Sequence, residues 1–122
     1  MHVKQTVLCA ALVGGFAAAI PNGYAASLYF EKTPVNASSE KTCLSFASNV
    51  SRDMHFANGH KSPEEVAGET GGAYVAITCV ARPSQKATAI VMSVADTFDV
   101  AKRVGQDAAN RIRKVVCFDS PC

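Results

Sequence analysis

The chain has 122 residues, which is enough for one small domain with a thin hydrophobic core. Its formal net charge of +2 at pH 7 gives no strong electrostatic signature of a nucleic-acid partner. No uninterrupted apolar stretch reaches the roughly 18 residues needed to cross a bilayer, so we expect no membrane span.

The first 25 residues have the three-part pattern of a secretory leader. Lys4 gives a positive start, residues 6–20 form a short apolar stretch, and small residues follow a break at Pro21. We predict cleavage after Ala25, with cleavage one residue later as the second choice. This pattern predicts a signal peptide over 1–25 and a single small α+β domain over 26–122. It also predicts export, to the periplasm or the outside of the cell.

Cysteine number and spacing predict disulfides. Removing the leader takes Cys9 with it and leaves four cysteines: Cys43, Cys79, Cys117 and Cys122. An even number in a short exported chain indicates a disulfide framework, and four cysteines allow three pairings. We expect Cys43 to pair with Cys79 and Cys117 with Cys122. A bond from Cys43 to Cys117 or Cys122 is the alternative.

The cysteine pair at the end of the chain does not have the placement of a reactive dithiol. Cys117 lies at the C-terminal end of a predicted helix, where the negative end of the helix dipole opposes a thiolate. Ser120 and Pro121 favour a turn that brings Cys117 and Cys122 within bonding range. We therefore expect this pair to be structural.

The first half of the domain predicts a strand, a helix and a loop. Residues 27–35 alternate, with Leu28 and Phe30 on one face, which indicates a short strand. An amphipathic helix begins at Asn36 or Ser38, and its apolar residues are three and four positions apart. They are Cys43, Phe46, Ala47, Val50 and Met54. The glycine-rich residues 57–72 predict a loop with one short helical turn, which Ser62 starts and Gly68 ends.

The second half predicts a β-hairpin and a second helix. Residues 73–81 and 87–95 are β-branched runs joined by five residues. The final helix, with Asp96 as N-cap, carries one apolar stripe: Ala101, Val104, Ala108, Ile112 and Val115. Its Gly105 favours close packing between helix and sheet.

The order of these elements predicts an α+β fold. It is a small open-faced sandwich with strand, helix, strand, strand, helix, and a short edge strand over 116–119 is an option. The order is ferredoxin-like in topology only, which carries no function. The predicted disulfides tie this fold together.

The two faces of the hairpin suggest a contact surface. We expect one face to enter the core, with Val75, Ile77 and Cys79 beside Ile90, Met92 and Val94. The opposite face carries no charge and is the candidate interface. Its residues are Tyr74, Ala76, Thr78, Val80, Ala87, Ala89, Val91 and Ser93. An uncovered apolar patch usually marks a contact site, so we favour a homodimer stacked sheet to sheet over coverage by the chain's own loop at 57–72.

No catalytic constellation emerges from the sequence. His55 and His60 are the only histidines after the leader, and no serine lies in a G-x-S-x-G setting. The adjacent Glu64 and Glu65 point apart on a helical turn. Two histidines five residues apart match no common zinc signature, and no glycine pattern binds phosphate. We predict no enzyme activity, no cofactor and no metal.

The leading functional hypothesis is therefore an exported, non-catalytic binding or structural module that acts on an unknown protein or envelope component. A thiol-redox or metal-handling protein is the first alternative, because of the cysteines and histidines. An inhibitor or binder of anionic surfaces is the second. Basic residues on the final helix motivate it: Lys102, Arg103, Arg111, Arg113 and Lys114. The predicted export and the lack of interleaved aromatic residues favour a solvated helix face for these residues, so we expect no nucleic-acid partner.

Overall fold

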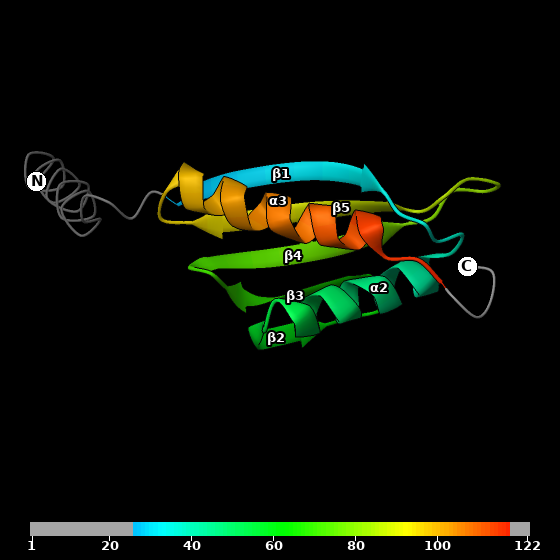
Figure 1. The fold of residues 1–122 in the computed structure, drawn as a ribbon, viewed down its shortest axis with the longest axis horizontal. Helices are drawn as coiled ribbons and strands as arrows, with labels where there is room; N and C mark the ends of the chain where they lie inside the picture. Colours follow the sequence, from blue (N-terminus) through cyan, green and yellow to red (C-terminus); the bar gives the residue numbers. More distant parts are fainter. Residues whose placement is uncertain (1–25, 118–122) are drawn as a thin grey trace, which may run out of the picture.

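The computed structural model describes residues 26–117, which form one antiparallel sheet with two helices on one of its faces (Figure 1). The elements in chain order are β1 (Ser27–Pro34), α2 (Glu40–Asp53), β2 (Ala57–Lys61), β3 (Glu65–Thr70), β4 (Ala73–Val80), β5 (Thr88–Ala95) and α3 (Phe98–Lys114). The sheet order is β1-β5-β4-β3-β2, and every neighbouring pair is antiparallel. The predicted α+β class is confirmed.

The helices begin one to three residues later than the sequence predicts. Ser39 is the N-cap of α2 and accepts a hydrogen bond from the Thr42 backbone N–H, where Asn36 or Ser38 was expected. Thr97, rather than Asp96, caps α3 in the same way. The apolar stripes are confirmed, because every residue predicted for the α2 stripe is buried and so are four of the five in the α3 stripe.

The expected loop over 57–72 is wrong, because it is a β-hairpin that extends the sheet. Ser62 accepts from the Glu64 backbone N–H in a turn between β2 and β3, so it does not start a helix. Gly71 and Gly72 have positive φ angles of 59° and 85° and form the two-residue turn into β4. Gly68 continues β3 instead of ending a helix, and a Cβ there would meet Phe56 Cβ at 2.7 Å.

Helix α3 lies across β1 and β5, and α2 lies along the β3 side of the sheet (Figure 1). The close packing expected at Gly105 is confirmed. A Cβ there would lie 2.5 Å from Tyr29 Cδ1 and 3.1 Å from Ser93 Cβ. The absence of a side chain at Gly105 therefore lets the helix approach the sheet closely.

The Cys43–Cys79 disulfide is confirmed and ties α2 to β4, with both residues in the core. Cys117 is not a free thiol either. Its predicted partner Cys122 lies outside the described residues, as do the predicted leader at 1–25 and most of the optional edge strand. None of the helices between residues 26 and 117 is both long and apolar enough to span a membrane.

Candidate functional site

The face of the sheet opposite the helices is a broad apolar surface, which we call the open face. Directly paired residues of antiparallel strands point to the same side, so the register gives the rows of this face. From β1 to β3, its first three rows are Leu28–Val94–Tyr74–Glu69, Phe30–Met92–Ala76–Ala67 and Lys32–Ile90–Thr78–Glu65, and the fourth row is Pro34–Thr88–Val80.

Large apolar side chains of the open face are exposed to solvent. Leu28 and Phe30 are 57% and 50% exposed, and Tyr74, Val80 and Val94 are 42%, 39% and 37% exposed. The uncovered side of an antiparallel sheet is normally polar. A contiguous apolar surface of this kind marks an interaction site.

The structure corrects half of the predicted interface. Tyr74, Ala76, Thr78 and Val80 lie on the open face as expected. Ala89, Val91 and Ser93 lie on the other face, beneath the helices, and each is 0% exposed. Ala87 is also buried. The residues expected in the core beside Ile77 were Ile90, Met92 and Val94, and these belong to the open face instead.

The strand register gives the basis of this correction. Ile77 pairs with Val91 and Cys79 pairs with Ala89, so Ala89, Val91 and Ser93 share a face with the core residues of β4. A hairpin of residues 73–81 and 87–95 has this same register, so the prediction was wrong in the face it assigned to Ile90, Met92 and Val94 and not in the register. Both faces of this hairpin are uncharged, so alternation of polar and apolar residues did not reveal the error.

The chemical gradient across the open face is pronounced. In the second row, the large Phe30 and Met92 lie on β1 and β5, and the small Ala76 and Ala67 lie on β4 and β3. The charged residues of these rows are Lys32 on the edge strand β1 and Glu65 and Glu69 on β3, and β2 continues the face beyond β3 with His60 beside Ala67. Large residues and a cation thus mark one side, and small residues and anions mark the other.

A polar cluster on the helix side joins β1 to α3. Arg113 donates to Glu31 Oε2 at 2.7 Å and to Thr33 Oγ1 at 2.8 Å. The Tyr29 hydroxyl donates to Glu31 Oε1 at 2.5 Å. This hydrogen bond, together with burial and the negative charge of Glu31, raises the pKa of Tyr29 above its ordinary value. The cluster fastens the final helix to the edge strand.

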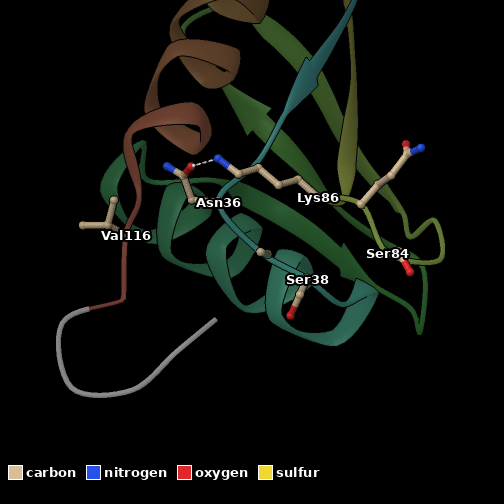
Figure 2. A pocket seen from close by; sticks show the side chains of 7 residues that line it. Asn36, Ser38, Ser84, Lys86 and Val116 are labelled. Carbon is tan, nitrogen blue, oxygen red and sulfur yellow. Dashed lines mark hydrogen bonds between the residues drawn. The ribbon is translucent and has the colours of Figure 1, made fainter.

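A cavity of about 600 Å³ lies at one end of the sheet, between the β4–β5 loop, the segment before α2 and the segment after α3 (Figure 2). Its lining residues are Asn36, Ala37, Ser38, Ser84, Gln85, Lys86 and Val116. Lys86 Nζ donates to Asn36 Oδ1 at 3.1 Å. Asn36 Nδ2 in turn donates to the carbonyl oxygens of Arg113 and Val115. These polar groups bond to one another, so they hold three chain segments together.

His55 and His60, the two histidines considered as metal ligands from the sequence, do not belong to a metal-binding cluster in the described part of the chain. His55 follows α2 with a positive φ of 56°, and His60 is exposed on β2. Within residues 26–117, no three His, Cys, Asp or Glu side chains are grouped to hold a metal ion. Glu65, expected on a helical turn, lies on β3 in the third row of the open face.

Comparison of the chain with models of protein families, with curated proteins and with solved structures finds no match.

Proposed function

We propose that this protein is an exported, non-catalytic binding module and that the open face of its sheet is the binding surface. The observation that carries the proposal is the exposure of Leu28, Phe30 and Tyr74 on the face of the five-stranded sheet that the helices do not cover. Burying such side chains gains about 25 cal/mol for each Å² of apolar surface removed from water. A partner that covers this face therefore has a substantial driving force.

Export is supported by the leader pattern of residues 1–25 and by the buried Cys43–Cys79 disulfide. Disulfides persist in oxidising compartments such as the bacterial periplasm and the outside of the cell. N-terminal sequencing of the protein recovered from its natural compartment tests this part. We expect the mature chain to begin at Ala26, and a mature chain that begins at Met1 contradicts export through a cleaved leader.

Two further observations weaken the alternatives of a thiol-redox protein and of a binder of anionic surfaces. Cys43 and Cys79 are 0% and 3% exposed, so an external thiolate has no access to their bond. Two of the basic residues of α3 have acidic partners within the protein. Arg111 pairs with Asp107 at 3.0 Å and Arg113 pairs with Glu31 at 2.7 Å. These pairs reduce the charge that α3 offers to an anionic surface.

An immobilised-protein experiment tests the binding surface. The wild type, Phe30→Lys and Phe98→Lys are coupled to a resin and exposed to fluid from the natural compartment. Phe98 is a matched control, because it is 52% exposed but lies on the helix side of the sheet. We expect a component that the wild type and Phe98→Lys retain and Phe30→Lys does not, and a further copy of this chain counts as such a component. Equal retention by all three proteins, or by none, contradicts the proposal.

A further inference from the structure

We propose that the open face is occupied by a second copy of this chain, related by a two-fold axis parallel to the strands. This proposal rests on the proposed function, because it names the partner of the same surface. The axis passes between β5 and β4, so that four of the five strands lie over a different strand of the partner and the edge strand β2 lies outside the overlap. The copy of β1 covers β3, and the copy of β5 covers β4.

The open face has the size that a specific dimer needs. Strands β1, β4 and β5 have eight residues each, and the proposed overlap takes in four of the five strands of the sheet. At strand spacings of about 4.8 Å and a rise of about 3.3 Å per residue, the flat projection is about 500 Å² per copy. Two copies cover about 1,000 Å² before the relief of the side chains is counted, which reaches the lower limit for a specific interface.

The two-fold axis matches large side chains with small ones. It places Phe30 of one copy over Ala67 of the other and Met92 over Ala76, each twice by symmetry. Ala67 and Ala76 lie deep among larger neighbours, with exposures of 2% and 8%, whereas Phe30 protrudes. Packed sheets interdigitate in this way to fill the space between them.

The same axis matches opposite charges. Lys32 on β1 and Glu65 on β3 lie in one row, so the axis places each Lys32 over Glu65 of the other copy. Glu69 lies in the first row, opposite Leu28 of the other copy, and its exposed carboxylate accepts a hydrogen bond from Asn58 Nδ2. Complementary charges at a rim fix the register of an interface more than they add affinity.

The other face-to-face arrangement fits the residues less well. An axis perpendicular to the strands places β1 over β1 and β3 over β3. Bulky side chains such as Phe30 then crowd the β1 edge, while the alanines of β3 leave a gap. Lys32 and Glu65 also remain apart and do not meet. The residues therefore select the axis parallel to the strands.

Charge exchange between two variants tests this geometry. Lys32→Glu and Glu65→Lys each replace two attractive pairs with two repulsive ones, and we expect each to weaken dimerisation roughly tenfold. An equimolar mixture should restore the wild-type affinity, because each subunit then meets an opposite charge at both contacts. The double variant Lys32→Glu, Glu65→Lys should also dimerise. Sedimentation velocity over a concentration series measures all four samples.

Met92→Lys tests the centre of the interface, with Phe98→Lys as control. Met92 is half-buried on the open face, so the variant retains the core of the monomer. A lysine there is buried without a partner in the dimer, and we expect dimerisation to weaken at least 100-fold. Circular dichroism shows whether the variant is folded, and the charge-exchange mixture remains decisive if it is not.

The outcomes separate this proposal from the proposed function. A monomeric wild type at micromolar concentration, or a mixture that does not restore association, overturns the dimer with this axis. Binding of the apolar dye anilinonaphthalene sulfonate then distinguishes the remaining cases. A monomer that binds the dye through the open face, with binding lost in Met92→Lys, leaves that face available for a different partner. A monomer that binds no dye overturns both proposals.

Discussion

At the scale of single residues, Gly105 controls how closely α3 approaches the sheet. Alanine is a better helix former than glycine by about 1 kcal/mol, so helix propensity alone predicts that Gly105→Ala stabilises the protein. The contact with Tyr29 predicts the opposite, because the new Cβ would lie 2.5 Å from Tyr29 Cδ1. We expect a net loss of about 1–3 kcal/mol in the free energy of unfolding, as for other overpacked cores.

Urea denaturation of Gly105→Ala measures this effect, with Lys102→Ala on the exposed side of α3 as the control. The loss should shrink in a Tyr29→Ala background, because the two side chains then no longer collide. A more stable Gly105→Ala protein would show that helix propensity outweighs packing at this position.

Tyr29 gives the stability of the protein a dependence on alkaline pH. Its folded pKa is raised above 10.0, chiefly because the hydroxyl donates a hydrogen bond to Glu31. A group whose pKa is raised by folding contributes stability below its unfolded pKa and loses that contribution as the pH rises through the folded pKa. We therefore expect the stability advantage of the wild type over Tyr29→Phe to be constant below about pH 9 and to decrease above about pH 10.

Denaturant midpoints from neutral to alkaline pH measure this difference, in which the titration of other groups cancels. Glu31→Gln is a useful companion, since it keeps an acceptor oxygen and removes the charge. The difference in stability between Glu31→Gln and Tyr29→Phe should decrease less steeply with rising pH than the difference between wild type and Tyr29→Phe. A difference between wild type and Tyr29→Phe that is flat across this range contradicts the role assigned to the hydroxyl.

At the scale of elements, the disulfide joins α2 to the centre of the sheet. It closes a loop of 36 residues between Cys43 and Cys79, which includes the β2–β3 hairpin. On the chain-entropy estimate, this cross-link contributes roughly 4 kcal/mol by restricting the unfolded chain. We expect the Cys43→Ala, Cys79→Ala double variant to lose about 3–5 kcal/mol of stability in thermal or urea unfolding. A loss below about 1 kcal/mol contradicts a structural role for this bond.

Elements with strong periodic patterns are predictable from the sequence, whereas the β2–β3 hairpin is not. The apolar stripes of α2 and α3 and the β-branched runs of β4 and β5 gave these four elements close to their observed bounds. Strands β2 and β3 were read as loop because Gly59 and Gly68 interrupt them. The signal that identifies the hairpin is the Gly71–Gly72 pair, which lies between two runs and suits a two-residue turn.

The predicted contact surface was half correct for a physical reason. The open face was recognised on β4 from its lack of charge, but larger residues of β5 were assigned to the core. The core side of β5 instead carries Ala89, Val91 and Ser93, because α3 approaches the sheet closely at Gly105. Side-chain size therefore gave the wrong face. The predicted surface also lacked the residues of β1, although the alternation of Leu28 and Phe30 indicates that they share one face of that strand.

At the scale of the whole molecule, the account predicts a four-layered dimer with helices outside and two sheets within. In the proposed dimer, α2 and α3 cover one face of each sheet and the partner covers the other. A thin core in a small chain is stabilised by such coverage, because the apolar residues of β1, β4 and β5 leave water only on association. The open face thus links the fold to the proposed function.

Crosslinking across the proposed axis tests this account most directly. Lys32→Cys and Glu65→Cys are prepared separately, with tags of different size, and treated with a thiol crosslinker about 10 Å long, which matches the spacing of packed sheets. Within either homodimer the two new cysteines are separated laterally by three strand spacings, about 14 Å. We expect efficient crosslinking only in the mixture, between one chain of each kind. Crosslinking of Lys32→Cys with itself to the same extent, or no crosslinked dimer in the mixture, would contradict the two-fold axis and with it the central claim.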